Sequence, residues 1–211
     1  MTPRLLVFAS GTKNGGGSGF ENLVASTKGG RLVANIVGVV CNHERGGVRE
    51  RAERLGIPFI HFAGPYDAEH YQKIVTEARA DFVALSGWLK LAVGLNPRTT
   101  FNIHPAPLPE FGGKNFYGMK THEAVLEAYK AGRITHSAVS MHFVTPEFDE
   151  GPVFFSHPVE ILPQDTPETL AHRVNEIEHR YQPEITNKVV HGEISWDGVH
   201  PDSLLGPDGA L

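Results

Sequence analysis

The stretch Arg4-Leu-Leu-Val-Phe-Ala-Ser-Gly-Thr-Lys-Asn-Gly-Gly-Gly-Ser-Gly-Phe20 decides the fold. Residues 4–10 form a short, continuous apolar run, which predicts a buried strand. A glycine-rich loop follows at 11–19, and apolar residues then recur from Phe20 at the spacing of an amphipathic helix. The spacing of Ser18 and Glu21 predicts a capping box at the start of that helix. A strand, a glycine-rich loop and a helix in this order indicate an α/β protein.

The same alternation continues through the first half of the chain. Apolar runs predict strands at 32–42, 58–62 and 81–86, and helical periodicity predicts helices around 48–55 and 71–78. Strands that alternate with helices favour a mostly parallel central sheet with helices on both faces. Ligands bind such sheets beyond the carboxyl ends of the strands.

The second half adds a short strand at 101–104, a helix around 122–129, and strands at 135–144 and 153–161. A long final helix is expected from Thr166, with Pro183 as a place where it kinks or restarts. The tail after about residue 200 is rich in proline, glycine and aspartate and is expected to be loose. Because we find no internal repeat or linker, we expect residues 1–211 to form a single domain.

Composition narrows the class of protein. Hydrophobic residues make up 40% and charged residues 20% of the chain, which is close to the globular average. The formal net charge of −5 disfavours a nucleic-acid partner, since phosphate backbones attract basic proteins. No apolar stretch is long enough to cross a membrane, so we expect a cytoplasmic protein. The single cysteine, Cys41, excludes an internal disulfide and a multi-cysteine metal site.

The loop at 11–19 has two interpretations. Glycines allow backbone N–H groups to approach a ligand, and the helix N-terminus that follows favours an anion, so Gly17, Ser18 and Gly19 could hold a phosphate. The alternative is a flexible surface loop. The sequence does not fit a dinucleotide fingerprint, because no acidic residue closes the second strand. It also lacks the Gly-Lys-Ser/Thr end of a P-loop.

The segment Phe101-Asn-Ile-His-Pro-Ala-Pro-Leu-Pro109 carries the strongest chemical signal. Asn102 and His104 are two residues apart on an extended segment and therefore share one face. An amide and an imidazole side by side can both donate hydrogen bonds to one oxygen, as a tetrahedral oxyanion requires. These two residues are our candidates for the reacting centre.

Two further residues are candidates beside this pair. Asp149 lies in the turn Asp149-Glu-Gly-Pro152, where it is either a turn former or, paired with a histidine across the sheet, an orienting carboxylate. His142 shares a strand face with the small residues Ala138 and Ser140, so it either lines a pocket or is structural. No histidine, aspartate and glutamate grouping has metal-ligand spacing, so we expect no metal.

Taken together, Asn102-Ile-His-Pro, Leu108-Pro109 and Phe143-Val-Thr-x-x-x-Asp-x-Gly-Pro152 resemble the folate-dependent formyltransferases. The resemblance extends from the first strand to Trp196. It implies a Rossmann-like formyltransferase fold and 10-formyltetrahydrofolate as co-substrate. Within this family the chain is most similar to the members that formylate the amine of phosphoribosylglycinamide in purine biosynthesis.

The resemblance implies catalytic roles for three residues. Asn102 and His104 would polarise the formyl oxygen and hold the oxyanion. Asp149 would keep His104 protonated and help to move protons. It also implies a cis peptide bond between Leu108 and Pro109.

The resemblance implies two binding regions as well. The N-terminal half would bind the ribonucleotide, with Gly17, Ser18 and Gly19 on the phosphate, and Glu178 from the final helix would bond the ribose hydroxyls. The C-terminal half would complete the folate site, whose residues would be Leu89, Lys90, Leu91, Asn102, Thr145 and Asp149. No nucleic acid, membrane or metal is implied, and the oligomeric state stays open.

Two loops depart from the family pattern. The phosphate loop is longer by about six residues, with Gly19 where asparagine is common, and residues 113–119 are also extended. Three alternatives therefore stay open. The protein could formylate an amino sugar nucleotide, hydrolyse formyltetrahydrofolate, or sense folate or nucleotide without catalysis.

Overall fold

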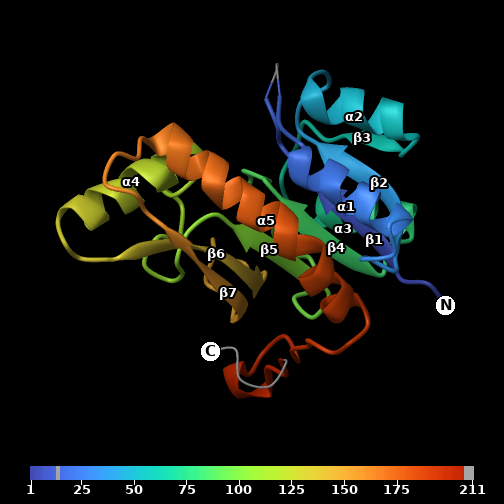
Figure 1. The fold of residues 1–211 in the computed structure, drawn as a ribbon. Helices are drawn as coiled ribbons and strands as arrows, with labels where there is room; N and C mark the ends of the chain where they lie inside the picture. Colours follow the sequence, from blue (N-terminus) through green and yellow to red (C-terminus); the bar gives the residue numbers. More distant parts are fainter. Residues whose placement is uncertain (13–14, 207–211) are drawn as a thin grey trace.

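The computed structural model describes residues 1–12 and 15–206, so Lys13 and Asn14 of the predicted phosphate loop lie outside the described part (Figure 1). Seven strands form one sheet in the order β3-β2-β1-β4-β5-β6-β7. The strands are β1 (Arg4–Phe8), β2 (Asn35–Cys41), β3 (Phe59–His61), β4 (Phe82–Ser86), β5 (Thr100–His104), β6 (His136–Phe143) and β7 (Val153–Glu160). The helices are α1 (Ser18–Lys28), α2 (Gly47–Leu55), α3 (Ala68–Ala78), α4 (Met119–Lys130) and α5 (Pro167–Val190).

The sheet changes direction at β5. β1 to β5 pair in parallel. β6 is antiparallel to β5, and β7 is antiparallel to β6. The prediction of a mostly parallel sheet is therefore confirmed, and β5 is the strand where the two halves meet.

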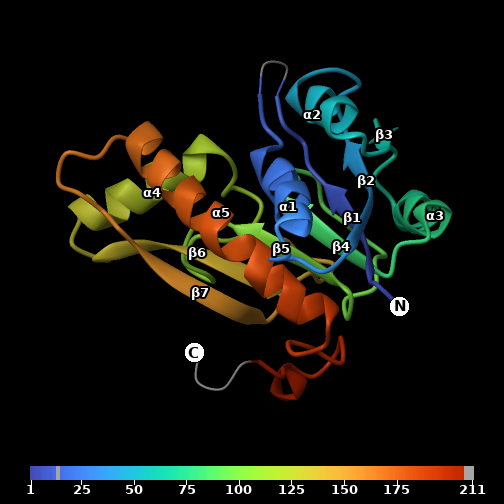
Figure 2. The same ribbon diagram turned by 45° about the vertical axis from the view of Figure 1, so that its right-hand side comes forward.

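Helices cover both faces of the sheet, as the alternation predicted. One core cluster joins the sheet to residues of α1, α2, α4 and α5. A second cluster on the other side contains Tyr71 of α3 and the indole of Trp88. Figures 1 and 2 show α5 crossing the sheet diagonally, with α1 beside it and α4 at its far end. The connections from β1 to β2 and from β2 to β3 run over one face of the sheet, and the connection from β3 to β4 runs over the other face. The strand order therefore reverses at β1.

The start of α1 differs from the predicted capping box. Gly17 is the N-cap with φ 80°, and no side chain caps the helix. Ser18 is already helical, so its hydroxyl is not placed at the cap. Glu21 instead lies 2.7 Å from Arg51 Nε and 2.6 Å from Arg54 Nη2, which joins α1 to α2. A left-handed N-cap favours glycine, and residue spacing alone does not reveal it.

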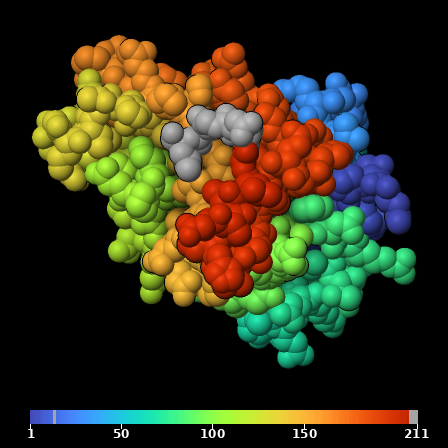
Figure 3. All heavy atoms as spheres, turned by 90° about the horizontal axis from the view of Figure 1, so that it is seen from below, coloured from blue at the N-terminus to red at the C-terminus, as the bar shows by residue number. Residues whose placement is uncertain are grey.

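The C-terminal region contains a long helix and several local hydrogen bonds. Thr166 and Thr169 form a reciprocal capping box, and α5 continues through Pro183 to Val190 without a restart. Beyond it, residues 201–203 form a 3-10 turn, Leu205 pairs with Ser195, and Trp196 Nε1 donates to the His200 carbonyl. Figure 3 shows this red segment packed against the rest of the molecule. The loose tail stays a prediction, and residues 207–211 lie outside the described part.

Within the described ranges, none of the helices combines the length and apolarity that crossing a bilayer requires.

Candidate active site

The predicted pair lies on β5, where the parallel and antiparallel halves of the sheet meet. Asn102 and His104 alternate with Phe101 and Ile103, whose side chains belong to the core on the opposite face. His104 is the last residue of the strand and is 4% exposed. The two polar side chains therefore share the face and the strand end where an α/β sheet binds its ligand.

Asp149 comes to this pair from the turn after β6. Its Oδ2 lies 3.6 Å from His104 Nδ1, and its Oδ1 lies 3.4 Å from Asn102 Nδ2. The Gly113 backbone N–H donates to Oδ2 at 3.0 Å. Asp149 has φ 58°, in the left-handed region that aspartate and asparagine tolerate best. The structure thus brings together all three residues that the sequence proposed for the reacting centre.

His142 is the fourth member of the cluster, for which the sequence predicted either a pocket-lining or a structural role. It is the cross-strand partner of Asn102 in the β5–β6 register. Its Nδ1 lies 2.8 Å from the Phe143 carbonyl oxygen and must donate to it, which leaves Nε2 as an acceptor. Asn102 Nδ2 lies 3.1 Å from that Nε2, and His142 Nε2 lies 3.4 Å from Asp149 Oδ1. His142 therefore sets which end of the Asn102 amide points at Asp149.

The pKa of His104 is set by opposing effects of its surroundings. Its Nε2 lies 2.7 Å from the Phe111 carbonyl oxygen and donates to it, so Nδ1 is the nitrogen that faces Asp149. Burial lowers the pKa of His104, and the opposing effects of Asp149 and the Phe111 carbonyl do not restore it. Burial thus opposes the imidazolium that the resemblance implied, and Asp149 favours it.

Asp149 itself is ionised. Burial alone would raise its pKa, but the neighbouring His142 and His104 side chains and the Gly113 N–H together lower it. A buried carboxylate next to a neutral imidazole can accept a proton and pass it to Nδ1. This geometry suits a proton relay between the two groups.

The predicted phosphate loop leads directly into α1. Gly17 has φ 80°, and a Cβ there would lie 3.0 Å from Val48 Cγ2. α1 begins at Ser18, and the first amide that pairs back into the helix is that of Glu21, with the Gly17 carbonyl. The amides of the first turn therefore face outward at the positive end of the helix dipole, which is a geometry that suits an anion.

The chain is similar in sequence to known proteins. It matches the family described as formyl transferase over residues 3–186. The chain belongs to the formyl transferase family. A protein of Arabidopsis thaliana named phosphoribosylglycinamide formyltransferase, chloroplastic, is 37% identical over 209 residues, which are 93% of this chain and 69% of that protein.

The chain also matches two further proteins over nearly their whole length. The Bacillus subtilis phosphoribosylglycinamide formyltransferase is 30% identical over 198 residues, which are 89% of this chain and 94% of that one. The solved structure of glycinamide ribonucleotide transformylase 1 from Symbiobacterium toebii has a TM-score of 0.79 at 27% identity and covers 93% of this chain and 92% of that one. The predicted Rossmann-like formyltransferase fold is thereby confirmed.

In this formyl transferase the predicted folate segment, Leu89 to Leu91, is anchored by buried polar groups. The Leu89 N–H donates to Ser10 Oγ at 2.9 Å. The Tyr71 hydroxyl donates to the Leu91 carbonyl at 3.0 Å and accepts from Trp88 Nε1 at 3.0 Å. Lys90 Nζ lies 5.4 Å from the Tyr66 ring centroid. Sequence reasoning missed Tyr71, because only the fold brings α3 beneath this segment.

The other predicted binding residues lie further from the cluster. Glu178 is on α5, where burial raises its pKa to about 7 against the hydrogen bond from Asn175. Thr145 opens the turn that leads to Asp149, with its hydroxyl 3.4 Å from the Glu147 carbonyl oxygen. The predicted Leu108–Pro109 cis peptide is present, and a second one, Gly64–Pro65, was not predicted.

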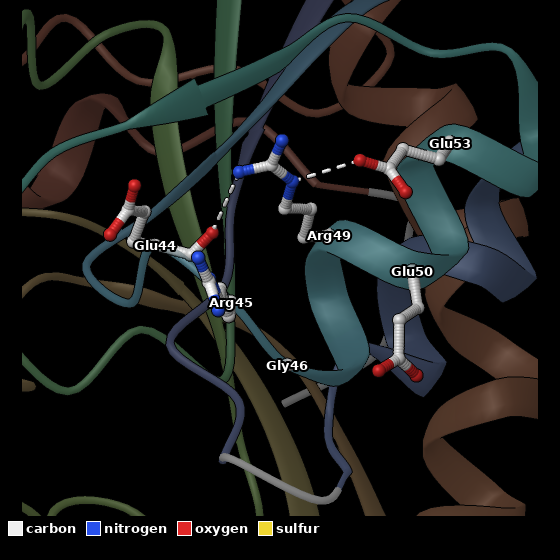
Figure 4. A pocket seen from close by; sticks show the side chains of 6 residues that line it. All are labelled: Glu44, Arg45, Gly46, Arg49, Glu50 and Glu53. Carbon is white, nitrogen blue, oxygen red and sulfur yellow. Dashed lines mark hydrogen bonds and ion pairs between the residues drawn. The ribbon is translucent and has the colours of Figure 1, made fainter.

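A surface hollow of about 410 Å³ lies away from this cluster, over the N-terminus of α2 (Figure 4). Arg49 in its lining pairs with Glu53 at 2.8 Å and donates to the Glu44 carbonyl at 3.2 Å. The buried cluster at β5 is the candidate for the reacting centre, because its polar groups converge on one strand end. Across residues 1–12 and 15–206, no group of three or more histidine, cysteine, aspartate or glutamate residues is arranged to hold a metal ion.

Proposed function

We propose that this formyl transferase moves the formyl group of 10-formyltetrahydrofolate to the amine of phosphoribosylglycinamide, a step of purine biosynthesis. The observation that carries the proposal is the convergence of Asn102, His104 and Asp149 at the end of β5. The relatives named for this activity match nearly the whole chain. A cytoplasmic location belongs to the same proposal.

In the proposed reaction the amine attacks the formyl carbon, and negative charge develops on the formyl oxygen. Asn102 donates to that oxygen the amide N–H that otherwise makes the 3.4 Å contact with Asp149 Oδ1, and His142 accepts the other N–H and holds the amide in this orientation. Asp149 accepts the proton that the amine loses and passes it to His104 Nδ1. His104 then stabilises the oxyanion as an imidazolium and returns the proton to the departing folate nitrogen. The net change is one formyl group and one proton exchanged between two amines.

The substrate is tested by comparing acceptors. Purified protein is given 10-formyltetrahydrofolate with phosphoribosylglycinamide, with an amino sugar nucleotide, or with neither, and loss of the formylfolate is followed. We expect fast loss only with phosphoribosylglycinamide. Fast loss with the amino sugar nucleotide would support that alternative. Formate release without an amine would identify a hydrolase, and tight binding without turnover would identify a sensor.

The proposal places the ribonucleotide phosphate on the amides of Gly17, Ser18 and Gly19. Gly17→Ala is expected to raise the KM for phosphoribosylglycinamide about tenfold, since a left-handed alanine costs about 1–2 kcal/mol and the added Cβ presses on Val48. The KM for formylfolate should stay the same. Gly132→Ala is the matched control, because Gly132 has φ 70° and nothing lies within 4 Å of its Cβ position. An unchanged ribonucleotide KM in Gly17→Ala would place the phosphate elsewhere.

The proposal also places the folate on the segment from Leu89 to Leu91. Tyr71→Phe keeps the ring but removes the hydroxyl that joins Trp88 to the Leu91 carbonyl. We expect the KM for formylfolate to rise about threefold to tenfold, in line with one or two lost hydrogen bonds, while the ribonucleotide KM is unchanged. Tyr66→Phe, in the same aromatic cluster, is the control. Equal kinetics for the two variants would show that this anchor does not serve the folate site.

A further inference from the structure

Gly19, the second residue of α1, is a glycine because of its surroundings. Its φ lies outside the left-handed region, so the backbone does not require glycine there. A Cβ at this position would overlap Ser86 Oγ and lie 3.2 Å from Gln182 Oε1. The space of a side chain at position 19 is therefore filled by two polar groups from other elements.

Ser86 and Gln182 form a buried hydrogen-bonded pair. Ser86 is the last residue of β4 and is 8% exposed, while Gln182 on α5 is 1% exposed. Gln182 Nε2 donates to Ser86 Oγ at 3.1 Å. A serine hydroxyl can both accept and donate, so the pair stays bonded in either orientation of the amide. Gln182 Oε1 has no hydrogen-bond partner in the described part of the chain, so it does not link the pair to any further residue there.

The pair lies between the two predicted halves of the ribonucleotide site. Gly19 belongs to the phosphate loop, and Gln182 is one helical turn beyond Glu178 on α5. A second contact fixes the same two helices, because Asn22 Nδ2 donates to the His179 carbonyl at 2.8 Å. The distance from the α1 N-terminus to Glu178 is thus set by how closely Gly19 packs on Ser86 and Gln182.

We propose that Ser86 and Gln182 are positioning residues for the ribonucleotide, and that they hold the α1 N-terminus at a fixed separation from Glu178. This inference rests on the proposed function. A phosphate on the α1 amides and a ribose on Glu178 belong to one rigid ligand, so a small displacement of α1 weakens both contacts together. The displacement concerns α1, so we expect the folate segment and the Asn102 cluster to keep their geometry, although Ser86 lies three residues before Leu89 and pairs with Ile103 of β5.

The test uses the overlap at position 19. Gly19→Ala is expected to lower the Tm and to raise the KM for phosphoribosylglycinamide about tenfold or more, with the formylfolate KM unchanged. Adding Ser86→Ala removes the overlapping Oγ and leaves the new Cβ 3.2 Å from Gln182 Oε1 and 3.7 Å from the Cβ of residue 86. The double variant should therefore recover much of the lost Tm and KM, and it should remain about threefold above the wild-type KM because it lacks the Ser86–Gln182 hydrogen bond. Gln182→Met, which keeps volume but removes the amide, should raise the ribonucleotide KM about threefold.

Val189→Ala is the control for destabilisation alone, since it opens a cavity in a buried part of α5 and should lower the Tm without changing either KM. A normal ribonucleotide KM in Gly19→Ala, or a double variant no better than Gly19→Ala, would overturn the inference. If wild-type protein does not use phosphoribosylglycinamide, the proposed function is wrong. Unfolding of the single and double variants still decides whether residues 19 and 86 compete for the same space.

Discussion

Replacing Asp149 by asparagine is expected to lower kcat by a hundredfold or more, within the range of about 10²–10⁴ that positioned proton transfer supplies. Asparagine cannot accept the proton that the attacking amine loses. It also removes the negative charge that partly offsets the effect of burial on the pKa of His104. The pKa of His104 should therefore fall further, and the residual activity, which needs the imidazolium, should decline at a lower pH than in wild type.

The fold should survive this substitution. Asparagine adopts the left-handed conformation that Asp149 has at φ 58°, and its side-chain oxygen can still accept from the Gly113 N–H. The pKa of Asp149 is lowered from 3.8, so its charge contributes stability at neutral pH that is lost as the pH falls through the lowered pKa. The Tm of Asp149→Asn should be slightly lower than wild type at pH 7, and the gap should close in acid. A folded variant with normal turnover across the pH range would exclude Asp149 from the mechanism.

His104→Ala and Asn102→Ala should each lower kcat by roughly a hundredfold to a thousandfold, the usual loss when one oxyanion donor is removed. Both donors act on charge that exists only in the transition state, so neither KM should change much. The measurement is steady-state kinetics with both substrates varied. His136→Ala, at the exposed start of the same strand as His142, is the control for loss of a histidine.

Thermal unfolding separates these losses from misfolding, because His104 also bonds the Phe111 carbonyl and its removal lowers stability. Near-normal turnover in a folded His104→Ala protein would mean that another group holds the oxyanion. The same outcome for Asn102→Ala would confine Asn102 and its partner His142 to a structural role.

The order of elements could be predicted because its signals are local. Short apolar runs and helical periodicity predicted each strand and helix, although the strand expected at 32–42 begins only at Asn35. The start of α1 could not be predicted in detail, since it depends on the positive φ of Gly17 and on Glu21 pairing with α2. The pairing of Ser195 with Leu205 depends on tertiary contacts that composition does not report.

The candidate site also has some features that could be predicted from the sequence and others that could not. Asn102 and His104 could be paired from the sequence because residues two apart on a strand share a face. The contact between Asn102 and His142 depends on the β5–β6 register, and the hydrogen bonds of Phe111 and Gly113 depend on the path of the loop after β5. The pKa of His104 could not be predicted either, because burial is a property of the whole fold and it outweighs the nearby carboxylate.

The most direct test follows a carbon-13 label in the formyl group of 10-formyltetrahydrofolate through one turnover with phosphoribosylglycinamide. The proposed function predicts that the label appears in a new formamide on the ribonucleotide, one for each tetrahydrofolate released, and that Asp149→Asn forms this product far more slowly. Label recovered as free formate, or left on the folate while the ribonucleotide stays unchanged, would contradict it.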